Sequence, residues 1–140
     1  MATRYLLDSH VWLWLNGSPE KLSNRVKAIL EDEESELLLS TASIWELAIK
    51  VKTGKLVLPS EPRLYIEERM TANGVSALTI EPKHAILAAD LPDIHRDPFD
   101  RMLVAQAILE DLVFLTADAV LLGYEPKLLW AGASRPRVGL

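Results

Sequence analysis

The sequence predicts an α/β domain of three layers, with a central parallel sheet of about five strands and helices on both faces. Its short apolar runs contain almost no alternating polar residues, which is typical of strands buried on both faces of a sheet. Longer segments with caps, first-turn prolines and helical spacing of apolar residues lie between these runs, and this alternation favours parallel pairing. No repeat or long linker divides the 140 residues, so we expect one domain over 1–140, with 134–140 as a loose tail.

The expected strands are the apolar runs at residues 4–7, 37–40, 75–80, 112–116 and 127–131. The expected helices cover residues 9–16, 18–31, 43–53, 62–73, 82–91, 98–109 and 119–122. Local signals set several of these bounds. Ser18 precedes a first-turn proline, and Ser43 with Glu46 has the spacing of a capping box. Gly54 and Gly74 are placed to end the helices before them.

The stretch from His95 to Ala107 predicts the most distinctive helix of the chain. Asp97 followed by Pro98 is typical of an N-cap and a first helical residue. Between residues 102 and 109 only Gln106 interrupts an apolar run, so this helix is expected to be buried on most of its circumference. Such a helix has more apolar surface than one sheet face needs, and contact with a second copy of the chain would cover the excess.

Composition excludes several kinds of site. The chain has no cysteine, which removes disulfides, thiolate zinc sites and cysteine nucleophiles, and its three histidines are too far apart for an imidazole-rich metal site. The net charge of −5 argues against broad affinity for nucleic acid, although it permits a nuclease whose acidic site is offset by bound metal. No signal sequence or membrane-spanning run is evident, so we expect a soluble, cytoplasmic protein.

Four carboxylates stand at the ends of predicted elements: Asp8, Glu46, Asp100 and Asp118. Taken singly, each has a plain structural explanation as a helix cap, a first-turn acid or a turn residue, and Glu46 also has Lys50 four residues on for a helix ion pair. Asp8 and Asp118 both follow predicted strands, however, and ligands of open parallel sheets gather at the carboxyl ends of strands.

Taken together, the four carboxylates predict a metal site for RNA cleavage. Grouped acids repel one another and raise one another's pKa values unless a cation neutralises them. Oxygen ligands without cysteine or clustered histidine favour Mg²⁺ or Mn²⁺ over zinc, and a metal-bound water needs no protein nucleophile to attack a phosphodiester. The chain also has no glycine-rich dinucleotide motif and no Walker motif.

Two further groups of residues have both a structural and a functional interpretation. The tryptophans lie inside apolar runs and are expected in the core or an interface rather than as base-stacking platforms; they are Trp12, Trp14, Trp45 and Trp130. Several cations either contact an RNA backbone or belong to an ordinary solvated surface, with neither favoured; they are Lys50, Lys52, Lys55, Arg96 and Arg101.

Four short motifs occur in order along the chain: LLDSH at 6–10, SIWELAIK at 43–50, HRDPFDRML at 95–103 and LTAD at 115–118. Together they resemble the PIN-domain ribonucleases, and specifically the VapC-like toxins of type II toxin–antitoxin systems. The resemblance extends from Tyr5 to about Trp130.

The resemblance implies a PIN fold, Mg²⁺-dependent endoribonuclease activity on an RNA substrate with Mn²⁺ as a possible substitute, a homodimer and a cognate antitoxin. Carried onto this sequence, Asp8 and Asp100 would bind the metal directly, and Glu46 would position metal or water. Asp118 would complete the shell of a second ion or act through water, and Thr116 matches a small hydroxyl residue beside the site. His10 receives no catalytic task, and capping is a sufficient explanation of Asp97.

Two other classes of protein compete with this interpretation. The first is a non-catalytic PIN-like module that docks a basic protein partner on its acidic edge. The second is a receiver-like or phosphatase-like domain with a carboxylate nucleophile. That class needs paired acids in the first loop, whereas Asp8 is followed by Ser9 and His10, so it is disfavoured.

Overall fold

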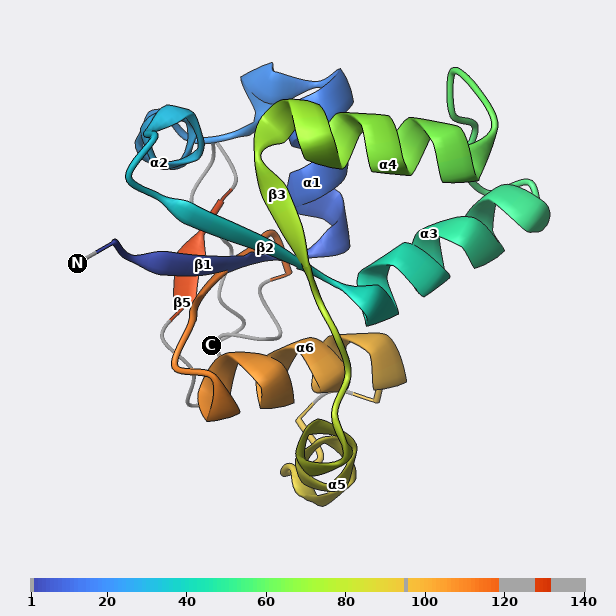
Figure 1. Ribbon diagram of the computed structural model, residues 1–140. Coiled ribbons are helices and arrows are strands. Elements are labelled where there is room, and N and C mark those ends of the chain that lie inside the picture. The colour runs from blue at the N-terminus through green and yellow to red at the C-terminus, as the bar shows by residue number, and fades with distance from the viewer. Residues whose placement is uncertain (1, 95, 119–127, 132–140) are drawn as a thin grey trace.

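A computed structural model of the chain describes residues 2–94, 96–118 and 128–131 (Figure 1). Five strands form one parallel sheet, as expected, and their order is β3-β2-β1-β4-β5. They are β1 (Arg4–Leu7), β2 (Glu36–Ser40), β3 (Val75–Leu78), β4 (Val113–Thr116) and β5 (Leu128–Trp130). The helices are α1 (Ser9–Gly17), α2 (Asn24–Glu31), α3 (Thr41–Lys52), α4 (Pro62–Asn73), α5 (Pro82–Asp90) and α6 (Pro98–Leu109), with a 3₁₀ turn, η1 (Pro19–Lys21).

Alternate residues of the central strands build two cores, one on each face of the sheet. Leu7 of β1 and Leu39 of β2 belong to the core beneath α1, α2 and α4, whereas Leu6 belongs to the core beneath α5 and α6. Figure 1 shows α2 and α4 on one side of the sheet and α5 and α6 on the other. The three-layer arrangement therefore follows from strands that are apolar on both faces.

The position of β1 in the middle of the sheet determines where the first motif lies. Leu7 is in register with Leu39 of β2 on one side and with Leu115 of β4 on the other. Because the strands are parallel, β1, β2 and β4 all end at the same edge of the sheet, and Asp8 is the first residue beyond β1 at that edge.

The continuous helix predicted from Ser18 to Glu31 is wrong: the structure divides it into η1 and α2. Leu22 lies between the two with an extended backbone, and its side chain is buried in the core. Ser23 then caps a new helix, since its hydroxyl accepts a hydrogen bond from the Val26 backbone N–H at 3.2 Å. Burial of Leu22 and a second capping serine therefore override the helical spacing.

The predicted helix start at Ser43 is also wrong. The helix α3 begins at Thr41, and the cap is Ser40, whose hydroxyl accepts from the Ala42 backbone N–H at 3.1 Å. Ser43 is a buried residue inside the helix, so it forms no capping box with Glu46. The Glu46 side chain is thereby left for another role.

The helix α6 has the predicted cap, and its middle has the predicted burial, but Ile108 and Leu109 at its end are 37% and 41% exposed. The Asp97 carboxylate accepts hydrogen bonds from the backbone N–H groups of Phe99 and Asp100, and every residue from 103 to 107 is buried. Its partner on the outer side is α5 of the same chain. The apolar surface that was expected to need a second copy is thus covered largely within the chain.

The guanidinium of Arg101 ties α5 to the first turn of α6. It donates hydrogen bonds to the backbone carbonyls of Ala88, Leu91 and Pro92, at 3.0, 2.7 and 3.1 Å. These carbonyls belong to the end of α5 and the turn after it, where helical partners run out. Arg101 is therefore engaged in the fold, which leaves it less suited to the RNA contact considered from the sequence.

Some expectations concern parts of the chain that are not described. The predicted helix at 119–122 and the predicted loose tail at 134–140 lie outside the described residues, and the predicted strand at 127–131 is seen as β5. Within the described residues, none of the helices has the length and apolar character needed to cross a membrane.

Gly74 offers a test of how α4 ends. It has φ +68°, in the left-handed region, and a Cβ there would meet no atom within 4 Å. Gly74→Ala should therefore lower the free energy of unfolding by about 1 kcal/mol through backbone strain alone. Gly17→Ala is the matched control: it also has open space, lies inside α1 and does not have a left-handed φ, so it should be neutral or stabilising. Urea unfolding of both variants measures the difference, and equal effects would contradict it.

Candidate active site

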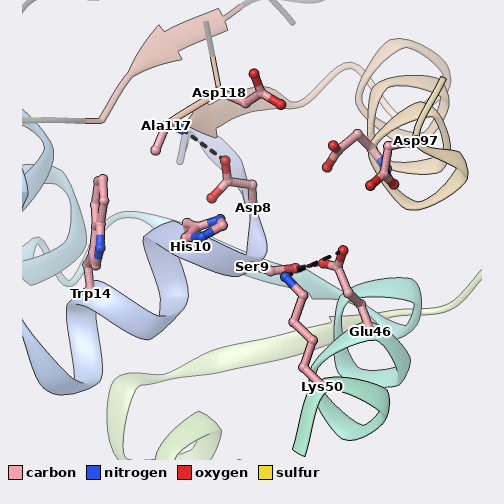
Figure 2. A pocket seen from close by; sticks show the side chains of 10 residues that line it. Asp8, Ser9, His10, Trp14, Glu46, Lys50, Asp97, Ala117 and Asp118 are labelled. Carbon is pink, nitrogen blue, oxygen red and sulfur yellow. Dashed lines mark hydrogen bonds and ion pairs between the residues drawn. The ribbon is translucent and has the colours of Figure 1, made fainter. Parts of the chain in front are cut away.

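All four predicted carboxylates line one cleft at the carboxyl edge of the sheet (Figure 2). The cleft has a volume of about 370 Å³. Its lining comes from the start of α1, from α3, from the start of α6 and from the end of β4, and consists of Asp8, Ser9, His10, Trp14, Glu46, Lys50, Asp97, Asp100, Ala117 and Asp118. Segments that are far apart in the sequence meet here because their strands end at the same edge.

Asp8 is the most buried of the four, with only 5% of its surface exposed. Its Oδ1 accepts a hydrogen bond from the Val11 backbone N–H at 2.7 Å, so Asp8 caps α1 as the sequence suggested. Its Oδ2 accepts from the Thr116 hydroxyl at 2.8 Å and from the Ala117 backbone N–H at 2.9 Å. The carboxylate is thus fixed in one orientation by donors from both α1 and β4.

Burial raises the pKa of Asp8 above its ordinary value of 3.8. The hydrogen bonds from Val11, Ala117 and Thr116 act in the opposite direction, and so does the nearby imidazole of His10, but loss of hydration is the larger effect. A buried carboxylate with a raised pKa is a group whose negative charge a cation would stabilise.

Glu46 is held from two sides. The Ser9 hydroxyl donates a hydrogen bond to its Oε1 at 2.7 Å, and the Lys50 ammonium lies 3.9 Å from its Oε2. The ion pair with Lys50 is the one that helical spacing predicts. The contact with Ser9 joins α3 to α1 across the cleft wall, and helical spacing gives no sign of it.

Thr116 connects the ends of the strands. It is fully buried, donates its proton to Asp8, and accepts a hydrogen bond from the Asp118 backbone N–H at 3.0 Å. Its single hydroxyl therefore orients Asp8 and fixes the turn that carries Asp118 into the cleft.

Asp97 and Asp100 enter from the first turn of α6. Asp97 has the capping role expected of it, and it also lines the cleft, so capping is not its whole position in the site. Five carboxylates therefore face one lysine in the lining of the cleft. The backbone N–H groups at the start of α6 offset this charge only in part.

Several lining residues were not identified as functional from the sequence. Ser9 lies inside the LLDSH motif but was given no task, and His10 and Trp14 were set aside. His10 and Trp14 have i, i+4 spacing on α1, the helix that Asp8 caps, and this spacing is the signal that places both rings on the side of the cleft.

The donor set fits a hard divalent cation. The side chains available are carboxylates, with no thiolate, and Asp8 Oδ1 has only the Val11 N–H as a partner among the described residues, which leaves a lone pair for a further ligand. Among the described residues, no three of these carboxylates have oxygens within 4.8 Å of one another. Such an open set suits Mg²⁺, which keeps several of its waters.

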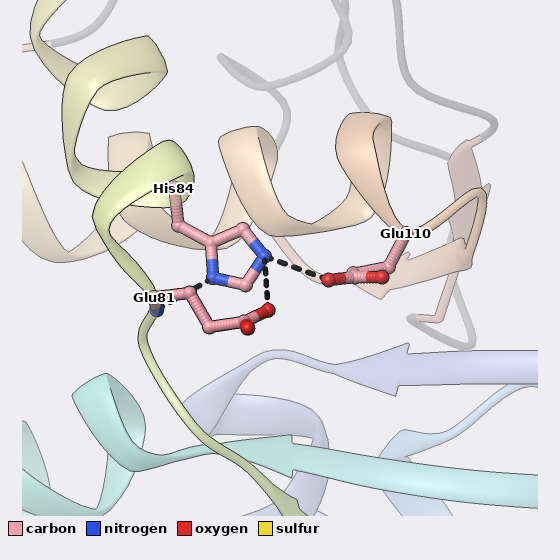
Figure 3. A group of neighbouring side chains, drawn as sticks. All are labelled: Glu81, His84 and Glu110. Carbon is pink, nitrogen blue, oxygen red and sulfur yellow. Dashed lines mark hydrogen bonds and ion pairs between the residues drawn. The ribbon is translucent and has the colours of Figure 1, made fainter.

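A second group of metal-type side chains lies apart from this cleft and consists of Glu81, His84 and Glu110 (Figure 3). The Glu81 backbone N–H donates to His84 Nδ1 at 2.9 Å, so the ring proton is on Nε2, which lies 2.9 Å from Glu110 Oε1. A metal at Nε2 would have to displace that proton from a ring whose other nitrogen is already an acceptor. Hydrogen bonding to His84, together with Lys83, lowers the pKa of Glu110. We therefore assign this group to the packing of α5 on α6.

Comparison with known proteins agrees with this geometry. The sequence matches the PIN domain family over residues 5–124, and the chain belongs to that family. Ribonuclease VapC22 of Mycobacterium tuberculosis is 30% identical over 132 residues, which span 91% of this chain and 99% of that protein. Ribonuclease VapC16 of the same organism is 39% identical over 61 residues, but that match spans only 44% of this chain and 43% of the relative.

Solved structures share the fold at lower identity. A toxin–antitoxin complex from Klebsiella pneumoniae has a TM-score of 0.63 at 18% identity and covers 90% of this chain and 96% of that chain. VapBC2 from Rickettsia felis, bound to a DNA fragment from its promoter, has a TM-score of 0.59 at 14% identity. The match covers 85% of this chain and 91% of that chain. The PIN fold expected from the sequence is confirmed.

The titration of Asp8 tests the geometry around it. Because the folded protein holds this proton more tightly than the unfolded chain, Asp8 contributes stability below about pH 3.8 that is lost as the pH rises through its folded-state pKa.

Thr116→Val removes one donor and should raise the Asp8 pKa further, whereas Thr116→Ser keeps the hydroxyl and should leave it near the wild-type value. Carboxyl-carbon NMR in metal-free buffer measures both, and an unchanged or lower midpoint in the valine variant would show that Thr116 does not stabilise the ionised form.

Proposed function

We infer that this chain is an endoribonuclease of the VapC type and the toxin of a toxin–antitoxin pair. One observation carries the inference: carboxylates separated by more than a hundred residues line a single cleft at the carboxyl edge of a PIN-domain sheet. The similarity to Ribonuclease VapC22 along nearly the whole chain supports RNA as the substrate.

We propose Mg²⁺ as the cofactor, with Mn²⁺ as a substitute. Asp8 and Asp100 would bind it directly, Glu46 would position metal or water, and Asp118 would complete the shell of a second ion or act through water. When bound, the ion supplies Lewis-acid polarisation of the phosphodiester and a water of lowered pKa.

The side chains around the cleft have separate tasks. Thr116 and Ala117 keep Asp8 aimed into the site, and Ser9 holds Glu46 where it can accept a proton from an attacking water. The Lys50 ammonium, next to Glu46, is placed to meet a phosphate oxygen. The helices α1 and α6 both begin at the cleft, and helix N-termini favour phosphate groups.

We also propose two protein partners. The excess of carboxylates in the cleft suits a basic segment of an antitoxin, and several fold neighbours are toxin–antitoxin complexes. The homodimer implied by the resemblance no longer rests on the middle of α6, which is buried against α5. Exposed apolar side chains on α5, after α5 and at the end of α6 support it instead; they are Ile86, Ile94, Ile108 and Leu109.

The alternative is a non-catalytic module that uses the same acidic edge to dock a basic partner. All four acidic positions that the resemblance implies line the cleft, which favours catalysis. The two functions differ in one respect: removing a single metal-binding charge would end cleavage but would only weaken the docking of a basic segment.

Cleavage of RNA by the purified chain is the direct test. Asp100→Asn or Asp8→Asn should reduce cleavage more than about 100-fold, because each change removes a proposed metal ligand. Glu33→Gln removes the same charge from an exposed turn before β2, at the opposite edge of the sheet, and should be neutral. Cleavage of labelled RNAs in Mg²⁺, Mn²⁺ and EDTA measures the effect.

Two results would contradict this proposal. Cleavage that persists in EDTA or in the Asp100→Asn protein would place the activity elsewhere. Absence of both cleavage and metal binding would favour the docking module.

The hydrogen bond from Ser9 to Glu46 gives an independent prediction. Ser9→Ala removes the donor that orients Glu46 and should reduce metal affinity or turnover by about 10- to 100-fold. Ser43→Ala deletes another buried serine hydroxyl, in α3 but outside the cleft, and should change neither. Calorimetric metal titration and cleavage rates distinguish the two variants; equal effects would mean that Ser9 acts only on stability.

A further inference from the structure

Two aromatic rings stand in the wall of the acidic cleft. Trp14 and His10 are four residues apart on α1 and therefore lie on the same side of that helix. Their ring centroids are 6.3 Å apart with planes inclined at 61°, and both residues line the cleft. Figure 2 shows them on the α1 side, across from Asp97.

Packing alone does not explain the position of Trp14. Trp12, two residues earlier, is fully buried and fills the core beneath α1, as expected for a tryptophan in an apolar run. Trp14 is only half-buried: part of it contacts that core, and part faces the cleft with the carboxylates. The expectation that the tryptophans lie in the core or an interface therefore holds for Trp12 but is incomplete for Trp14.

An acidic cleft needs a source of RNA affinity other than cations, and an aromatic ring can supply it. RNA-binding surfaces usually gain most of their affinity from cations that contact phosphates. Among the described residues that line the cleft, Lys50 is the one lysine or arginine, and it is paired with Glu46. Stacking of bases on aromatic rings is the other general source of affinity for single strands, and it does not depend on positive charge.

We propose that Trp14 is a positioning residue that stacks on an unpaired nucleobase of the RNA beside the scissile phosphate, with His10 as the flanking ring. This assignment rests on the proposed ribonuclease function. Stacking at this wall would hold one nucleotide while the phosphodiester next to it lies over the carboxylates. Since both faces of a paired base are already covered by its neighbours in a helix, the nucleotide at Trp14 must be unstacked.

Trp45 provides the matched comparison. It is 63% exposed on α3 and next to Glu46 in sequence, but its ring packs against Phe99, with centroids 5.3 Å apart, and it does not line the cleft. It is therefore an exposed tryptophan close to the site in sequence but outside the cleft.

The test measures RNA binding in an Asp100→Asn background, so that the probe stays intact whether or not the wild type cleaves it. The probe is a short, fluorescein-labelled single-stranded RNA of mixed sequence, compared with an abasic ribose-phosphate chain of equal length and charge. Trp14→Leu preserves apolar packing but removes the ring, and should weaken RNA binding by about 5- to 100-fold without changing binding of the abasic chain. Trp14→Phe should restore much of the affinity, and Trp45→Leu should match the parent.

Each result has a defined meaning. Wild-type affinity in Trp14→Leu, equal losses for both probes, or an equal loss in Trp45→Leu would overturn the assignment. Failure of the parent to bind the RNA more tightly than the abasic chain would overturn it as well. Selective loss in Trp14→Leu would support it even if the wild-type chain cleaved no RNA, in which case the proposed nuclease function would fail and the base contact would remain. Circular dichroism of each variant confirms the fold.

Discussion

Asp8 is a carboxylate removed from water at the point where the central strand ends, and the rest of the site is arranged around that burial. Loss of hydration disfavours its charge, and three hydrogen bonds, one from α1 and two from the end of β4, partly compensate for that loss. The compensation requires β1 and β4 to be neighbours in register. The order of the sheet and the orientation of this one side chain are therefore parts of the same constraint.

Of the remaining carboxylates, Asp118 reaches the cleft on the turn after β4, and the others lie on helices that are fixed at their first turns or to each other. Asp97 caps α6, and Arg101 attaches α6 to α5. The position of Asp100 is therefore fixed by the packing of these two helices. Glu46 is set by a serine of α1. The acids come from four segments, namely the start of α1, α3, the start of α6 and the turn after β4, and this division keeps like charges near one another in fixed positions.

The parts of this architecture that local patterns specify were predictable from the sequence. Strands apolar on both faces predicted the parallel sheet, and the Asp97-Pro98 pair predicted the start of α6. The errors occurred where tertiary contacts decide between two local signals: Leu22 is drawn into the core and breaks a helix, and Ser40 caps α3 in place of Ser43. Asp8 and Asp118 were found because they follow strands, and Glu46 and Asp100 because they lie near the predicted starts of helices. The contacts made by Ser9 and Trp14 join segments whose proximity no local pattern encodes.

The pairing of β1 with β4 also determines when the site can form during synthesis of the chain. The bond between Asp8 and Thr116 closes a loop of 108 residues, so the first residue of the site waits for almost the last strand before it is held. Until Thr116 and Ala117 have been synthesised, the chain lacks Asp118 and two of the three donors that orient Asp8. If the protein degrades RNA, this order of assembly delays the onset of activity until synthesis is nearly complete, which gives a partner made at the same time the opportunity to meet it first.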